Sequence, residues 1–289
     1  MLLSKKLKIW QFNLRFPCES FWNNDTMLDL TCDGHVHTSL CRHAVGEMDE
    51  YVRAAVARGL RQLFFLEHLE RGIDYFERTW LTEADFDEYF RCGRELREQY
   101  RGTLEIGLGV EVGYNPDCRD ELLAALAGRP WDRIGISYHF MSAAGRHYNL
   151  VSRRSENIAA LGRLGVARVL SDYFATLLEA VEILPGQVVC HLDAAMRHHP
   201  EVRLEPGHYR QIEEILSVMA RRGMALEINA SGLARRGQPY PAREIIAEAV
   251  RRGINLVAGS DSHRPESVGD FAELARFLYE QQIQVISEA

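Results

Sequence analysis

Histidines and carboxylates at short, regular spacings are the residues of this chain best suited to chemistry. His35 and His37 are two apart in DGHVHT, so on an extended backbone both rings point the same way. Asp261 and His263 repeat that spacing in GSDSH, and His43 follows His37 by six residues. Imidazole and carboxylate together suit zinc, manganese or iron. The spacing therefore predicts a transition-metal site.

Four more candidate ligands each follow an apolar run that is typical of a strand: His68, Glu111, His139 and His191. We expect Glu111 to bridge two metals. Taken alone, His139 could be a hydrogen-bonded core histidine and Glu111 a buried acid paired with an arginine, because a buried carboxylate is costly unless it is paired or metal-bound. The joint pattern of all these residues favours a multinuclear metal site over many separate structural roles.

Strand-like and helix-like segments alternate along the chain and would bring these residues together. Strands are predicted at 27–32, 62–66, 103–110, 133–137, 187–190, 225–228 and 255–258. Helices are predicted at 47–58, 83–100, 119–126, 155–183, 209–222, 242–252 and 265–279. Roughly seven strand–helix units without a linker favour one closed α/β barrel over a doubly wound sheet. In such a barrel the strand ends share the face that carries the active site.

Length and composition agree with a single barrel domain. The 289 residues compare with about 250 in common barrels, and 46% of them are hydrophobic, enough for a sizeable core. We expect residues 1–26 to be a poorly ordered N-terminal extension and residues 27–289 to form the barrel. The formal net charge of −7 argues against a nucleic-acid surface, but a bound metal could still attract an anionic small substrate.

No membrane association is expected, because no apolar run reaches the roughly 18 residues of a membrane span. The six cysteines are scattered and form no C-x-x-C pair, which predicts reduced thiols and a cytoplasmic location. Cys32 and Cys41 flank the first histidines. We interpret them as small buried hydrophobes rather than as metal ligands.

Three carboxylates near the candidate ligands have open roles. Asp33 and Glu67 would point away from the neighbouring histidines, and either orient ligands from behind or pair with helix charges. Asp193 follows His191 by two residues and could hydrogen-bond a ligand or the substrate. The histidines outside the pattern are interpreted as surface residues or as residues behind the ligands: His147, His198, His199 and His208.

Four further polar residues are candidates for binding a substrate. Arg197 and Arg264 could clamp a phosphate group through the two-pronged guanidinium, and the alternative for each is a solvated surface arginine. Asn229 and Ser231 follow the sixth predicted strand and could donate hydrogen bonds to the substrate.

Several motifs resemble the PHP (polymerase and histidinol phosphatase) superfamily and, within it, the monofunctional histidinol-phosphatases. The resemblance covers about residues 29–280, and its motifs are DGHVHTSLCRH, GVEVGY, ISYHF, HLDAAMRH, EINASGL and GSDSH. Two positions depart from the family's pattern. Glu67 stands where the family commonly has aspartate, and Met196 stands where it commonly has a basic residue, with Arg197 one position later.

The resemblance implies a distorted (β/α)7 TIM-like barrel with three metal positions. The implied ligands of the first are His35, His37, Glu111 and Asp261. Those of the second are Glu111, His139 and His191. Those of the third are His43, His68 and His263. The residues implied to be catalytic are Glu111, His191 and Asp261.

The activity implied is hydrolysis of L-histidinol phosphate to L-histidinol and phosphate, within histidine biosynthesis, with two or three divalent ions (Zn, Mn or Fe). One alternative is a PHP phosphoesterase acting on a nucleotide or sugar phosphate. Another is a metal-binding regulatory module without catalysis. An amidohydrolase-type barrel is disfavoured, because that family generally uses a metal-bridging lysine and this chain has no lysine after Lys8.

Overall fold

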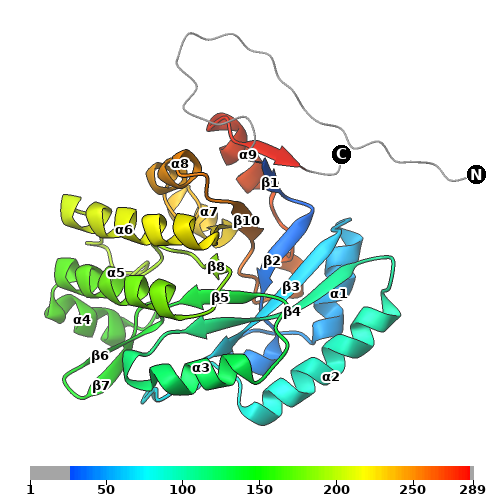
Figure 1. Cartoon of the computed structure of the whole chain (residues 1–289), viewed down its shortest axis with the longest axis horizontal. Coiled ribbons are helices and arrows are strands. Elements are labelled where there is room, and N and C mark those ends of the chain that lie inside the picture. Colours follow the sequence, from blue (N-terminus) through cyan, green and yellow to red (C-terminus); the bar gives the residue numbers. More distant parts are fainter. Residues whose placement is uncertain (1–26, 287–289) are drawn as a thin grey trace, which may run out of the picture.

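Seven parallel strands form a nearly closed barrel with helices around it, as expected (Figure 1). The computed structural model describes residues 27–286, so the expectation for residues 1–26 lies outside it. Neighbouring barrel strands follow the order of the chain: β2 (Cys32–Val36), β3 (Gln62–Leu69), β4 (Glu105–Gly113), β5 (Ile134–Ser137), β8 (Val188–Val189), β9 (Ala225–Asn229) and β10 (Leu256–Gly259).

The helices cover the outside of the barrel (Figure 1). Their bounds are α1 (Met48–Ala57), α2 (Glu83–Gln99), α3 (Arg119–Ala127), α4 (Ser155–Leu164), α5 (Val166–Ile183), α6 (Pro206–Arg222), α7 (Leu233–Arg236), α8 (Arg243–Arg251) and α9 (Ala272–Glu280). Helix α2 shows why they form. Thr82 and Asp85 make a capping box at its start, and Phe86, Tyr89 and Leu96 are buried at helical spacing. None of the helices among residues 27–286 is long and apolar enough to cross a membrane.

The barrel closes between its first and last strands, beside the candidate ligands. Val36 and Ser262 form an isolated parallel bridge. The backbone N–H of His37 donates to Ser262 O at 2.9 Å, and the N–H of Asp261 donates to His35 O at 2.9 Å. Closure therefore brings two motifs that are more than 200 residues apart in sequence to one edge of the barrel.

The first predicted strand, 27–32, is wrong. Met27–Asp29 forms β1, which pairs in parallel with the C-terminal β11 (Gln284–Ile286) outside the barrel. The side chain of Asp29 accepts hydrogen bonds from the backbone and hydroxyl of Thr31, which turns the chain and ends β1. The barrel strand begins only at Cys32.

Two predicted helices also differ from the structure. The helix expected over 155–183 is interrupted at Gly165, whose φ of 94° does not fit a right-handed helix, and becomes α4 and α5. The helix expected from residue 265 begins only at Ala272, after the 3₁₀ turn η4 (Pro265–Ser267) and Gly269, with φ 62°.

An antiparallel hairpin, which the sequence did not predict, follows β5. It consists of β6 (Phe140–Ala143) and β7 (Arg146–Asn149). Ala144 and Gly145 both have positive φ and make the turn between the strands. The hairpin starts directly after His139, so it stands at the end of the barrel that carries the candidate ligands.

Candidate metal centre

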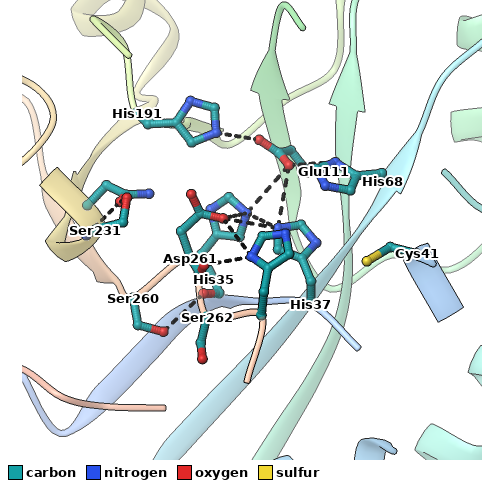
Figure 2. A network of polar contacts seen from close by, with 12 residues as sticks. His35, His37, Cys41, His68, Glu111, His191, Ser231, Ser260, Asp261 and Ser262 are labelled. Atoms are coloured by element: carbon teal, nitrogen blue, oxygen red, sulfur yellow. Dashed lines mark hydrogen bonds and ion pairs between the residues drawn. The ribbon is translucent and has the colours of Figure 1, made fainter. Parts of the chain in front are cut away.

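All nine candidate ligands converge at the carboxyl ends of the barrel strands. Figure 2 shows those labelled His35, His37, His68, Glu111, His191 and Asp261. One detail of the prediction is wrong. His35, His68 and Glu111 lie within β2, β3 and β4, not after them, because these strands begin or end later than expected. The pairing of β3 with β4 sets His68 directly beside Glu111.

Glu111 is the centre of the cluster, and its side chain has no solvent exposure. Its Oε1 lies 2.7 Å from His191 Nε2 and 3.2 Å from His139 Nε2, and it accepts a hydrogen bond from Ser137 Oγ. Around Oε2, three rings bring a nitrogen within 2.8, 3.5 and 3.6 Å: His68, His35 and His37. A carboxylate with imidazoles on both oxygens is placed to bridge two cations.

Four of the rings have their Nδ1 atom bound to an oxygen. The acceptors are Glu227 Oε1 for His35 at 2.7 Å, Glu70 Oε1 for His139 at 2.8 Å, Cys41 O for His43 at 3.0 Å and Asp261 O for His263 at 2.9 Å. An oxygen that accepts needs a proton on Nδ1, so in the neutral ring Nε2 carries the lone pair. These contacts therefore orient the Nε2 atoms as ligands.

The Nε2 atoms meet in pairs, and the pair formed by His43 and His263 requires a cation between its rings. His43 Nε2 lies 2.7 Å from His263 Nε2, and His35 Nε2 lies 2.8 Å from His37 Nε2. The Nδ1 protons of His43 and His263 are committed to carbonyl oxygens, so neither neutral ring can donate to the other. Two lone pairs facing one another at this distance repel, whereas a divalent cation would bind both. The residues present thus fit a metal centre.

Electrostatics hold several ligands in the form that binds metal. Burial alone would raise the pKa of Glu111, but the surrounding histidines outweigh it and hold that pKa well below its usual range. The same balance lowers the pKa of Asp261. Burial, with His68 and His263 nearby, lowers the pKa of His43 to about 3. These acids are ionised and this ring is neutral at pH 7, as metal ligation requires.

His35 and His139 are exceptions. Burial opposes a charge on the His35 ring, but Glu227 and Glu111 outweigh burial and raise its pKa well above the usual value. Burial opposes a charge on His139 too, but Glu111 and Glu70 outweigh burial and raise its pKa to about 10. In the cation-free protein His139 therefore holds a second proton between two carboxylates. A divalent cation at Glu111 would supply the same positive charge and displace that proton.

Two ligands occupy a strained backbone conformation. His191 has a φ of 26° and Asp261 a φ of 53°, in a region that residues other than glycine seldom adopt. Such a conformation costs about 1–3 kcal/mol and persists only where surrounding contacts enforce it. Here the N–H of His191 donates to Glu227 Oε2 at 2.7 Å, while the N–H of Asp261 closes the barrel against β2.

Sequence reasoning missed two buried carboxylates, Glu227 and Glu70, which orient His35 and His139. Gly259 and Gly113 make room for them, because a Cβ at either glycine would collide with the neighbouring carboxylate. A signal for each was present. Glu227 stands inside an apolar predicted strand, and Glu70 follows His68 by two residues, on the same side of an extended chain.

The roles left open for Glu67 and Asp33 are now clearer. Glu67 accepts hydrogen bonds from the N–H and Oγ1 of Thr38 at 2.8 and 2.6 Å, and its Oε2 lies 4.0 Å from His37 Nδ1. Asp33 accepts from the N–H of Ser260, which fixes the end of β10. Both side chains are buried, and neither pairs with a helix charge.

Asp193 does not face the cluster. Its carboxylate accepts hydrogen bonds from both Nη atoms of Arg236, at 2.9 and 3.0 Å, and from the backbone N–H of Ala242 at 3.0 Å. His208, interpreted as a surface residue or a residue behind the ligands, is neither. It is buried between helices, where its Nδ1 accepts from the N–H of Glu205.

A cavity of about 590 Å³ opens above the metal centre, within the size range of small-molecule sites. Ser231 and Arg264 line it, as expected of substrate-binding residues. Arg197 lies deeper, with Nη1 3.7 Å from Asp261 Oδ2. Asn229 is buried; its Oδ1 accepts from Ser231, and its Nδ2 has no hydrogen-bond partner among residues 27–286.

Comparison with known proteins gives the relationships of this chain. It is 29% identical over 240 residues to a "Probable histidinol-phosphatase" of Deinococcus radiodurans, covering 82% of this chain and 88% of the relative. It is 27% identical over 259 residues to the histidinol-phosphatase of Bacillus subtilis, covering 82% and 95%.

Among solved structures, the barrel is similar to histidinol phosphate phosphatase from Lactococcus lactis, which was solved with zinc, L-histidinol and phosphate. The TM-score is 0.70 at 19% identity, covering 89% of this chain and 96% of that one, so the likeness supports the fold. The PHP domain family matches residues 33–231, more than half of the sequence. The chain belongs to the PHP domain family.

Proposed function

We propose that this protein is a metal-dependent phosphate monoester hydrolase that converts L-histidinol phosphate and water into L-histidinol and inorganic phosphate. The observation that carries the proposal is the convergence of nine imidazole and carboxylate side chains, five of which line a cavity that is also lined by arginines. The histidinol-phosphatase names of the relatives from Deinococcus radiodurans and Bacillus subtilis support the choice of substrate.

Two or three divalent ions (Zn, Mn or Fe) would be held by the cluster. The contacts support three groups of ligands. The first group is His35, His37, Glu111 and Asp261. The second is Glu111, His139 and His191. The third is His43, His68 and His263. When bound, such ions supply hydroxide at neutral pH and neutralise the charge that develops on phosphoryl oxygens.

The chain's own residues would hold this machinery in one arrangement. Glu111, His191 and Asp261 are the proposed catalytic residues. The shared carboxylate of Glu111 fixes the spacing of the first two groups, and Ser137 Oγ holds one of its oxygens. Asp261 lies between the imidazoles and Arg197, where it faces both the metal centre and the phosphate that would bind there.

Arginines supply the positive charge that a phosphate ester requires. Three arginines lie close together: Arg153, Arg197 and Arg235. Burial lowers the pKa of Arg235, and the charges of Arg197 and Arg153 lower it further. The only acid within ion-pair distance of Arg197 among residues 27–286 is Asp261, at 3.7 Å. A phosphate dianion would relieve this repulsion between like charges. Arg264 lines the cavity and would also meet the phosphate.

The outer wall of the cavity suits a small aromatic, cationic leaving group. Tyr75 and Phe140 lie with ring centroids 5.2 Å apart and offer apolar faces to an imidazole ring. Glu77 lines the same cavity, so its carboxylate, which pairs with Arg154 at 2.9 Å, could also bind a substrate ammonium group. A nucleotide would present no ammonium group to this carboxylate.

The test is phosphate release by metal-loaded protein from histidinol phosphate, a nucleoside monophosphate and a sugar phosphate. We expect the highest kcat/KM on histidinol phosphate. Glu111→Gln should abolish turnover without unfolding the barrel. The matched control is Glu105→Gln, on the same strand but exposed, which should retain activity. A preference for the nucleotide or the sugar phosphate would change the substrate, and no hydrolysis of any ester would favour a regulatory module.

We also propose that the protein works in the cytoplasm on a small molecule and does not bind nucleic acid. The cysteines at positions 32, 41, 92, 118 and 190 are all free thiols, which suits a reducing compartment. The net charge of −7 disfavours a nucleic-acid surface. Fractionation of cells, followed by detection of the protein, tests the location.

A further inference from the structure

A buried thiol lies beside the third group of histidines. Cys41 ends the 3₁₀ turn η1 (Ser39–Cys41), two residues before His43, and its side chain has no solvent exposure. Its sulfur and one ring nitrogen each of His43 and His263 all lie within 4.8 Å of one another. Figure 2 shows the Cys41 sulfur turned toward the imidazole cluster.

Burial raises the pKa of the Cys41 thiol, and the backbone N–H groups of His43 and Ala44 lower it only in part. Loss of the thiol proton would therefore have to be driven by a bound metal ion. Arg42, between Cys41 and His43, has a φ of 68°, and this turn of the chain brings both neighbouring side chains to one point.

The two imidazoles at this point need a cation, for the reason given above. Both Nε2 atoms carry a lone pair, and they face each other at 2.7 Å. The sulfur lies within 4.8 Å of one ring nitrogen of each histidine. A thiolate adds one negative charge to neutral rings, so it would partly neutralise a divalent cation held at this point.

We propose that Cys41 is a sulfur ligand of the third metal position, together with His43, His68 and His263. On binding, the S–H bond of Cys41 breaks, its proton leaves to solvent, and a sulfur–metal bond forms. Thiolate ligands favour zinc and other thiophilic ions over manganese or magnesium. The third position is therefore selective for zinc, whereas the first two offer only nitrogen and oxygen. The inference rests on the proposed function only in that this position binds metal.

A second buried thiol, Cys190, is the obvious alternative, because it lies within 4.8 Å of ligand atoms of His35 and Glu111. Its surroundings are different. The guanidinium of Arg133 lies near Cys190, whose thiol is among the groups that affect the pKa of Arg133. Arg133 Nη1 donates a hydrogen bond to Gly34 O. A fixed cation at this point would repel a metal ion. Cys190 is therefore a matched control for Cys41.

Cobalt substitution tests the proposal without using catalysis. Metal-free protein is titrated with Co²⁺ under anaerobic conditions, and the sulfur-to-cobalt charge-transfer band in the near ultraviolet is followed. Wild-type protein should develop the band. Cys41→Ser should lose it, while circular dichroism shows an unchanged fold, and Cys190→Ser should keep it. A wild-type protein that binds cobalt without the band overturns the proposal, even if Cys41→Ser fails to fold. So does loss of the band in Cys190→Ser.

Zinc–manganese competition gives the second readout. Removing an outer partner of a metal ligand commonly costs about 10- to 100-fold in affinity, so removing a direct ligand should cost at least about tenfold. Cys41→Ser should therefore weaken zinc at the third position by at least this factor and leave manganese nearly unchanged. Equal losses for both ions would contradict the proposal. Phosphate release, measured on the same samples, reports separately on the proposed function.

Discussion

Glu227 offers a prediction whose size follows from two hydrogen bonds. The side chain of Glu227 is 2% exposed. Its Oε1 accepts a hydrogen bond from His35 Nδ1 at 2.7 Å, and its Oε2 accepts one from the backbone N–H of His191 at 2.7 Å. In Glu227→Gln the amide keeps one acceptor oxygen and replaces the other by a donor. Only one of the two hydrogen bonds can therefore survive.

The loss is expected to appear as weaker metal binding. In one arrangement the amide oxygen still accepts from the N–H of His191, and the NH₂ group faces His35. The His35 proton then moves from Nδ1 to Nε2, and the protonated Nε2 cannot bind the metal. If the oxygen keeps His35, the strained His191 loses its backbone partner. A hydrogen bond to a charged group is worth about 1.5–3 kcal/mol. At about 1.4 kcal/mol per tenfold, metal affinity should fall by about 10- to 100-fold.

The assay is equilibrium competition with a chelator of known affinity, with metal content measured per chain. Glu105→Gln on β4 serves as the exposed control and should bind metal as the wild type does. Circular dichroism checks that both variants fold. Unchanged metal affinity in a folded Glu227→Gln protein would refute the reasoning that this carboxylate orients the ligands.

Three further predictions follow from the same geometry. Gly259→Ala should weaken metal binding as Glu227→Gln does, because the added Cβ would displace the Glu227 carboxylate. Gly113→Ala should displace Glu70 and weaken binding only at the second metal position. Metal content that stays at the wild-type value after dialysis would contradict both predictions. Removing metal with a chelator should lower stability by about 2.7 kcal/mol for each site held at 100 times its Kd, seen as a lower Tm, and an unchanged Tm would count against bound metal. Asp193→Ala should cost about 2 kcal/mol in urea unfolding, because Arg236 is left partly buried without its partner, and a change within 0.5 kcal/mol would not fit this role.

The sequence was sufficient for the barrel and for the convergence of the ligands, and both rest on the same physical rule. Side chains at the carboxyl ends of parallel strands meet on one face, so residues as distant as His35 and Asp261 could be grouped before any coordinates. The helix limits were also close: 47–58 became α1 (Met48–Ala57), with its capping residues on either side.

The errors came from features that depend on contacts distant in sequence. Strand 27–32 looks like a barrel strand, and only the pairing of Met27–Asp29 with the chain's C-terminal end removes it from the barrel. The sequence analysis missed Glu227 and Glu70, because an acid inside an apolar strand, or two residues after a histidine, does not reveal which side chain it contacts. Asp193 was expected, from its spacing to His191, to hydrogen-bond a ligand or the substrate, but its carboxylate binds Arg236, 43 residues later.

The most direct test of the account is anomalous diffraction from crystals of the metal-loaded protein, recorded on either side of the zinc absorption edge. We expect two or three peaks among the imidazoles and carboxylates around Glu111, with one of them between His43 and His263. A map without anomalous peaks at this cluster, from protein that hydrolyses histidinol phosphate, would contradict the claim that these side chains hold the catalytic metals.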